Sequence, residues 1–180
     1  DSPLFNRALS GQYPPASTLK PFVGMAALEA KTISWEKEIL DSGKYLVEGD
    51  DRPYKGWKEG GHGMVDMNKA IIESSDVYFY SLAYDLTIKN LAPFLEKFGF
   101  GKQSGLTKNE ATGILPSRKW KLGYIGEPWF KGDTINMGIG QGYITATPLQ
   151  IALAYSVLAN KGKFVKPRII EKIGAVSYTH

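Results

Sequence analysis

The sequence has 180 residues, 43% of them hydrophobic, a net charge of +4 and no cysteine. This length suits a single domain with a substantial core, and the lack of cysteine excludes disulfide bonds and thiolate metal sites. The basic residues are scattered rather than gathered in one block with aromatic residues, so we expect no nucleic-acid binding. No apolar run approaches the roughly twenty residues that span a bilayer, so the chain is either soluble as it stands or anchored through a segment outside it.

The stretch from Gln12 to Leu28 combines two prolines, a short polar segment and an apolar run. The run is too rich in Ala and Met for a strand, so it predicts a buried helix. Ser17 would lie at the helix N-terminus, where unpaired N–H groups and the helix dipole favour negative charge. Lys20 would lie one turn further along the same face, and a desolvated lysine can accept a proton. With both side chains shielded from water, this is the arrangement of an activated serine with a lysine base.

The Ser-x-x-Lys pattern is short, and a chain of this composition contains about one match by chance. Ser34 and Lys37 form a second match, which we interpret as a helix N-cap followed by a surface segment at 35–40. Ser17 differs because its helix continues as a run of apolar and small residues, which is typical of a helix through a core.

The segment 41–62 is rich in glycine and charged residues, which predicts a surface excursion with one short strand near 44–47. His62 lies among glycines, and the other histidine, His180, is the last residue. An isolated histidine is more often a structural hydrogen-bonding residue than a metal ligand, so we expect no metal site.

Two helices separated by a polar triplet, Ser-Ser-Asp at 74–76, are predicted within 64–87. Small polar residues between helices are usually caps, and Ser75 or Asp76 could cap the second helix. Because apolar helices flank the triplet, it should lie deep in the domain, where its polar groups need partners. A reactive serine–lysine pair would be such a partner.

The remaining sequence predicts short elements joined by turns. Thr147 and Pro148 suit the N-cap and the first position of a helix. The run Gly-Ile-Gly-Gln-Gly at 138–142 lacks the spacing of a dinucleotide-binding loop, so we expect no nucleotide cofactor. Helices are expected at 90–98, from 116–120 and at 149–160, and a strand at 164–170.

Three motifs, in this order, resemble those of a known family: Ser17-Thr-Leu-Lys20, Ser74-Ser-Asp76 and the glycine-rich segment 140–150. The first two resemble the S-x-x-K and S-x-N motifs of penicillin-recognising serine transpeptidases and serine β-lactamases. The third resembles the glycine-rich segment and following helix of the penicillin-binding transpeptidases. The surrounding sequence, such as 57–63, is similar to the class B penicillin-binding protein 2 family of Gram-negative bacteria, the cell-elongation transpeptidases. The resemblance extends over residues 3 to about 170.

The sequence departs from the family pattern in two places. Asp76 stands where most relatives have Asn, which favours the elongation subgroup, and Val77 breaks the S-D-N frame of a class A β-lactamase. The third family motif, Lys-Ser/Thr-Gly on an edge strand, does not occur in the sequence, and residues 175–180 do not resemble the family. We therefore expect 1–180 to be a partial transpeptidase domain, without the membrane anchor, the N-terminal domain and the C-terminal Lys-Ser/Thr-Gly region.

The resemblance implies an α+β fold of the penicillin-binding and β-lactamase type, mostly its helical part and truncated before the last edge strands. It also implies acyl transfer without a cofactor, in which Lys20 takes the proton from Ser17 and Ser17 attacks the D-Ala-D-Ala bond of a peptidoglycan stem peptide. The acyl group would then pass to an amino group of a neighbouring stem. Ser74 would relay the proton to the leaving group, and Asp76 would hold the donor peptide or the lysine. β-Lactams would acylate the same serine.

The partners that the resemblance implies are stem peptides, β-lactams, a SEDS-family glycosyltransferase and the rod-complex scaffold, at the periplasmic face of the bacterial inner membrane. Because one oxyanion-hole donor would come from the missing edge strand, the 180-residue segment itself is expected to be weak or inactive.

Three alternatives remain open at the level of sequence. A serine β-lactamase needs a deacylating base, and the sequence has no Glu-x-x-Leu-Asn segment that would supply one. A β-lactam sensor domain would acylate once and signal. In a non-catalytic scaffold, Ser17, Ser74 and Asp76 would only be caps.

Overall fold

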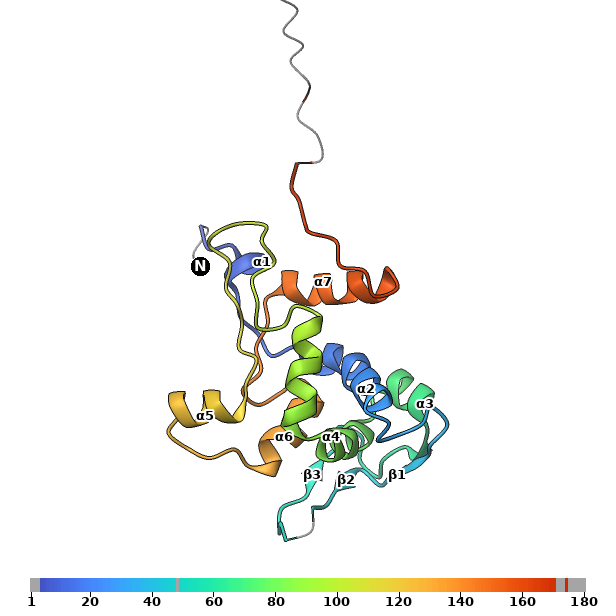
Figure 1. Cartoon of the computed structure of the whole chain (residues 1–180). Helices are drawn as coiled ribbons and strands as arrows, with labels where there is room; N and C mark the ends of the chain where they lie inside the picture. The colour runs from blue at the N-terminus through green and yellow to red at the C-terminus, as the bar shows by residue number, and fades with distance from the viewer. Residues whose placement is uncertain (1–3, 48, 171–173, 175–180) are drawn as a thin grey trace, which may run out of the picture.

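The computed structural model describes residues 4–47, 49–170 and 174. Helices dominate it, and the strands all lie in one excursion between α2 and α3 (Figure 1). The helices are α1 (Arg7–Ser10), the 3-10 helix η1 (Ala16–Leu19), α2 (Lys20–Glu29), α3 (Met67–Ile72), α4 (Asp76–Lys97), α5 (Arg118–Tyr124), α6 (Lys131–Gly138) and α7 (Pro148–Ala159). The strands are β1 (Ile39–Asp41), β2 (Lys44–Tyr45), β3 (Tyr54–Lys55) and β4 (Gly63–Val65).

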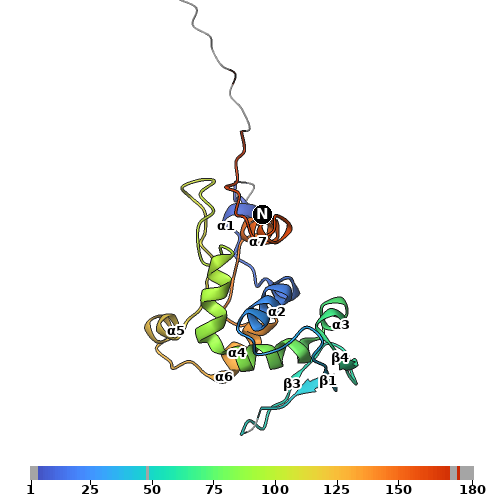
Figure 2. The same ribbon diagram turned by 45° about the vertical axis from the view of Figure 1, so that its right-hand side comes forward.

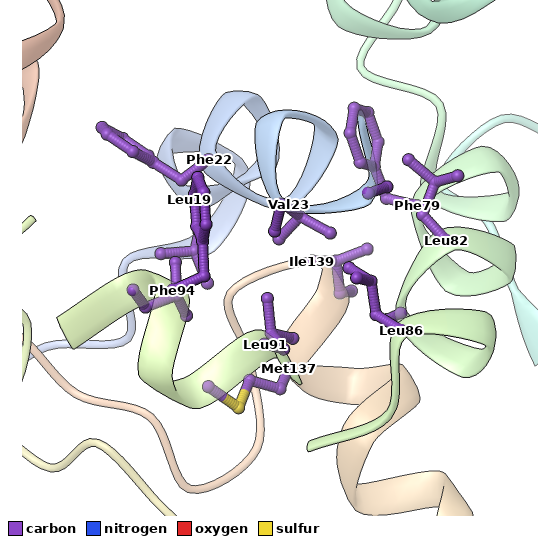
Figure 3. Close-up of a cluster of buried hydrophobic side chains, with 14 of the residues drawn as sticks. Leu19, Phe22, Val23, Phe79, Leu82, Leu86, Leu91, Phe94, Met137 and Ile139 are labelled. Carbon is purple, nitrogen blue, oxygen red and sulfur yellow. The ribbon is translucent and has the colours of Figure 1, made fainter. Parts of the chain in front are cut away.

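The core lies where η1, α2, α4 and α6 meet (Figure 3). The core residues labelled there are at most 7% exposed, and each buried side chain of this size stabilises the fold by about 1.5–3 kcal/mol. The buried helix predicted after Ser17 is therefore confirmed as α2, and its packing fixes the N-terminus of α2 relative to α4. The labelled core residues are Leu19, Phe22, Val23, Phe79, Leu82, Leu86, Leu91, Phe94, Met137 and Ile139.

The two helices predicted on either side of the triplet 74–76 are confirmed as α3 and the first half of α4. The helix predicted at 90–98 is the second half of α4, which bends at Thr87, where φ is +58° and ψ is 160°. Figures 1 and 2 show the two halves running in different directions, so both can face the same core.

Two antiparallel strand pairs shape the excursion between α2 and α3. β1 pairs with β4, and β2 pairs with β3 so that Tyr45 lies opposite Tyr54. Both tyrosine rings contact Tyr80 of α4, at centroid distances of 6.3 and 5.8 Å. The strand predicted near 44–47 is thus confirmed as β2, and aromatic contacts tie the excursion to the helical part.

The glycines at 138 and 140 allow close backbone approach. A β-carbon at Gly138 would collide with Ala83 and the Phe79 carbonyl of α4, and one at Gly140, where φ is +69°, would collide with the Ala16 backbone. The Ala16 N–H also donates to the Gly140 carbonyl at 2.9 Å. The glycine-rich segment therefore packs directly on the turn that precedes Ser17.

Of three further expectations from the sequence, the structure contradicts two and confirms one. Ser34 as a helix N-cap is wrong, because the chain turns at 35–36 and enters β1, where Ile39 pairs with Val65. The strand at 164–170 is also wrong, since no strand of the described chain lies beside this segment to complete a ladder. The helix expected at 149–160 is confirmed as α7, and Thr147 caps it by accepting from the Gln150 N–H at 3.1 Å.

The sequence analysis placed no helix at α1 or α6. His180 and residues 175–180 lie outside the described residues. Of the helices that are described, none combines the length and the hydropathy that crossing a bilayer requires.

Candidate functional site

Four side chains that the sequence analysis singled out meet where η1 and α2 approach the α3–α4 turn. The Ser74 hydroxyl lies 3.0 Å from the Ser17 hydroxyl and 2.8 Å from the Lys20 amine. The same amine lies 2.6 Å from a carboxylate oxygen of Asp76. One chain of hydrogen bonds therefore runs from Asp76 through Lys20 and Ser74 to Ser17.

Ser17 and Lys20 differ in their access to solvent. Lys20 is 2% exposed, whereas Ser17 is exposed, so the expectation that both are shielded from water is wrong for Ser17. The reason lies in η1, which turns Leu19 and Lys20 into the domain and leaves Ser17 on the outer side. No hydrogen bond joins Lys20 directly to Ser17, because the Ser74 hydroxyl lies between them.

The Lys20 amine is enclosed by three oxygen atoms. Besides the Ser74 hydroxyl and Asp76, it donates to the Ser74 carbonyl at 2.7 Å. Burial lowers the pKa of Lys20 from its ordinary value, although the hydrogen bond and charge of Asp76, and the charge of Asp41, partly oppose this. The amine therefore loses its proton more readily than an exposed lysine does.

The turn that carries Ser74 is held in an uncommon backbone conformation. Ser74 has φ of +53°, in the left-handed region that residues with a β-carbon seldom adopt. Ser75 is fully buried and caps α4 by accepting from the Tyr78 N–H at 3.2 Å, so the cap predicted at 75 or 76 is confirmed at Ser75. This geometry places the Ser74 hydroxyl between Ser17 and Lys20.

Trp57 holds the same turn from the excursion, and the sequence analysis gave it no role. Its backbone N–H donates to the second carboxylate oxygen of Asp76 at 3.0 Å, and its indole N–H donates to the Ser74 carbonyl at 3.1 Å. Asp76 thus gives one oxygen to Lys20 and the other to Trp57. Only the family resemblance of segment 57–63 could have pointed to this residue, because its backbone bond leaves no signal in residue type and its indole bond joins residues that no local pattern connects.

Behind the turn lies a buried pair formed by Asp41 and His62. The His62 Nδ1 is 2.6 Å from an Asp41 carboxylate oxygen, and both side chains are 2% exposed. The expectation that His62 is a structural hydrogen-bonding residue is therefore confirmed. Across the part of the chain that the structure describes, no group of three or more His, Cys, Asp and Glu side chains is arranged to hold a metal ion.

The geometry suits removal of a proton from Ser17 by way of Ser74. A neutral amine has two N–H groups and one lone pair. At Lys20 the N–H groups would face Asp76 and the Ser74 carbonyl, which are pure acceptors, and the lone pair would face the Ser74 hydroxyl. The same three oxygens can accept the three N–H groups of the protonated amine, so the neighbours of Lys20 accommodate both of its protonation states.

Comparisons with known proteins bear on the family and the fold of the chain. The model of the penicillin binding protein transpeptidase domain matches residues 1–180. The chain is 46% identical over 176 residues to the peptidoglycan D,D-transpeptidase MrdA of Haemophilus influenzae, covering 97% of this chain and 27% of that protein.

Two solved structures share the fold. PBP2 of Pseudomonas aeruginosa in complex with WCK 5153 superposes with a TM-score of 0.90 at 43% identity, covering 92% of this chain and 38% of that one. Helicobacter pylori PBP2 in complex with MreC superposes with a TM-score of 0.88 at 37% identity, covering 96% of this chain and 32% of that one. The α+β penicillin-binding fold, represented mostly by its helical part, is thereby confirmed.

Proposed function

The chain belongs to the penicillin-binding protein transpeptidase domain family, and from that premise we propose that it carries the nucleophile of a peptidoglycan D,D-transpeptidase of the cell-elongation type. The observation that carries the proposal is the hydrogen-bonded series Ser17–Ser74–Lys20–Asp76. The likeness of the chain to the Haemophilus influenzae peptidoglycan D,D-transpeptidase supports peptidoglycan as the substrate class. We propose that the bond attacked is the D-Ala-D-Ala bond of a stem peptide, as the motif resemblance implies.

In the acylation step, the Ser17 proton passes to Ser74 while the Ser74 proton passes to the neutral amine of Lys20. The Ser17 oxygen then bonds to the carbonyl carbon of the penultimate D-Ala. The carbon–nitrogen bond to the last D-Ala breaks, and its nitrogen takes a proton back from Ser74, which Lys20 resupplies. Such proton transfer typically contributes about 10²–10⁴ in rate.

In the second step an amino group of a neighbouring stem attacks the Ser17 ester. The amine loses its proton through Ser74 to Lys20. The Ser17 oxygen leaves as the new amide forms and takes a proton back from Lys20 through Ser74, which restores the hydroxyl and the neutral amine. Asp76 holds Lys20 in place through both steps, because its carboxylate is fixed on the other side by Trp57.

We also propose that 1–180 is part of a transpeptidase domain within a longer protein, with a membrane anchor, an N-terminal domain and a C-terminal Lys-Ser/Thr-Gly region outside it. The chain spans about a quarter of the MrdA relative that it matches, 27% of its length. The periplasmic face of the inner membrane is the proposed location. A SEDS-family glycosyltransferase and the rod-complex scaffold are proposed partners, the latter supported by the Helicobacter pylori complex with MreC.

Labelling of the full-length protein with a fluorescent penicillin tests the proposed nucleophile. We expect Ser17→Ala to abolish labelling. Ser34→Ala is the matched control, because Ser34 begins the other Ser-x-x-Lys match in the sequence but lies in a turn before β1. Labelling that survives Ser17→Ala would contradict the proposal, and continuous nitrocefin turnover by the unaltered protein would indicate a β-lactamase instead.

A further inference from the structure

The carboxylate of Asp41 connects the excursion to the turn that carries Ser74. One of its oxygens accepts from the Ser75 hydroxyl at 2.6 Å and is paired with His62, and the other accepts from the Gly43 N–H at 2.8 Å. The carboxylate thus has partners from its own loop, from the segment before β4 and from the α4 cap. A buried carboxylate with several donors is held firmly, since losing one donor leaves an unsatisfied charge.

Ser74 needs such support. A left-handed conformation costs a residue with a β-carbon of order 1 kcal/mol and persists only where the surroundings fix it. The N–H groups of Ser74 and Ser75 bond back to the end of α3, with the Ile71 carbonyl at 3.3 Å and the Ala70 carbonyl at 3.0 Å. On the other side, the Ser75 hydroxyl gives its hydrogen to Asp41 and accepts the Tyr78 N–H.

We propose that Asp41, held in place by His62, is a positioning residue for acylation: through Ser75 it fixes the turn so that the Ser74 hydroxyl lies between Ser17 and Lys20. This inference rests on the proposed transpeptidase function. Asp41 touches neither Ser17 nor Ser74 through a hydrogen bond, so it acts through its neighbours.

The loop around His62 is built to hold this carboxylate. The His62 N–H donates to the Asp41 carbonyl at 3.1 Å, so backbone and side chain of the two residues are joined. Gly61 has φ of +75°, and a β-carbon there would collide with the Asp41 backbone. The Lys69 amine of α3 donates to the His62 carbonyl at 2.9 Å, which ties the loop to the helix that precedes the turn.

Asp41 could also influence the site through its charge, which raises the pKa of Lys20. The two roles predict different behaviour. Asp41→Asn removes the charge and the acceptor of the Gly43 N–H but keeps an oxygen that can accept from Ser75, whereas Asp41→Leu removes all three.

The test measures acylation of the full-length protein by a fluorescent penicillin over a range of concentrations and pH. For Asp41→Leu and Ser75→Ala we expect the limiting acylation rate to fall about 10- to 100-fold, with the half-saturating concentration unchanged, because the reacting groups are displaced. Asp41→Asn should keep the limiting rate within about threefold, since the hydrogen bond to Ser75 survives. Circular dichroism establishes that each variant is folded.

Ser117→Ala is the matched control, because Ser117 caps α5 by accepting from the Trp120 N–H at 3.1 Å and has no link to Asp41. It should keep the unaltered rate. A folded Ser75→Ala variant with the unaltered limiting rate would overturn the inference, and it decides the question alone if Asp41→Leu does not fold. An equal loss in Asp41→Asn and Asp41→Leu would assign the effect to charge and overturn it too.

The unaltered protein in the same experiment separates this inference from the proposed function. If it is not labelled at Ser17, the transpeptidase proposal fails and the inference fails with it. If it is labelled and the variants behave like it, the inference alone fails.

Discussion

At the scale of single residues, the chemistry depends on how much Lys20 prefers its neutral form. Burial lowers its pKa, and the hydrogen bond and charge of Asp76 act in the opposite direction. These opposing effects mean that the carboxylate which orients the amine also stabilises its protonated form. The pH dependence of acylation measures the net effect on the pKa of Lys20.

We predict that Asp76→Asn moves the rise of acylation rate with pH to lower pH. The rate rises as Lys20 loses its proton, and removing the carboxylate charge lets the pKa of Lys20 fall further below its ordinary value. The measurement is the pH dependence of penicillin acylation in the full-length protein.

Asp66→Asn is the control for that experiment. Asp66 caps α3 by accepting from the Lys69 N–H at 2.8 Å, and asparagine caps helices equally well. Its pH profile should match that of the unaltered protein. A rise at the same or higher pH in Asp76→Asn would contradict the prediction.

The sequence could predict the members of the site better than their exposure. Helical spacing indicated that Ser17 and Lys20 share a face, and the flanking apolar helices indicated that the triplet 74–76 lies beside them. It could not indicate that η1 leaves Ser17 exposed, because an apolar run specifies which residues are buried and not how a preceding 3-10 turn is oriented. The Asp41–Ser75 bond joins residues far apart in the chain, and no local pattern encodes such a contact.

At the scale of elements, α6 and α4 approach each other through a glycine. A β-carbon at Gly138 would collide with Ala83 and the Phe79 carbonyl, so the backbones of α4 and α6 lie too close together there for a side chain at position 138. We predict that Gly138→Ala destabilises the protein by about 1–3 kcal/mol through overpacking. Urea unfolding of the full-length protein measures it.

Gly123→Ala is the matched control, since Gly123 also lies in a helix and no heavy atom is within 4 Å of a β-carbon built there. Alanine favours helix over glycine by up to about 1 kcal/mol, so this variant should be neutral or more stable. Loss of stability in Gly123→Ala equal to that in Gly138→Ala would assign the effect to glycine removal in general.

Elements with strong local signals were predictable and those that depend on neighbours were not. Thr147 and Pro148 indicate the start of α7, and Thr147 caps the helix in the structure as the sequence predicts. The helix α6 carries two glycines at its ends and little hydrophobic periodicity, so its stability comes from packing on α4. Segment 164–170 shows the opposite case, because it is rich in β-branched and aromatic residues but no strand of the described chain lies beside it to pair with.

At the scale of the whole molecule, the chain contains the proposed nucleophile and its proposed proton path but no Lys-Ser/Thr-Gly motif. By resemblance, the strand that carries this motif supplies a second donor to the oxyanion. Removing one such donor costs about 10²–10³ in rate. We therefore predict that the 180-residue chain reacts with a fluorescent penicillin about 10²–10³ more slowly than the full-length protein.

The measurement compares the second-order labelling rates of the 180-residue chain and the full-length protein. The Ser17→Ala variant of each protein serves as the blank. Equal rates would show that the proton path is sufficient without the strand. They would also leave the proposed nucleophile intact, because labelling would still depend on Ser17.

The contact between Gly140 and Ala16 has a consequence for drug resistance. Any side chain at position 140 would press on the residue that precedes Ser17, and the same oxygen would attack both the antibiotic and the wall precursor. A bacterium could not use this position to evade a β-lactam, because a displaced serine would serve neither. We therefore expect substitutions that lower β-lactam acylation but keep wall synthesis to leave Gly140 unchanged.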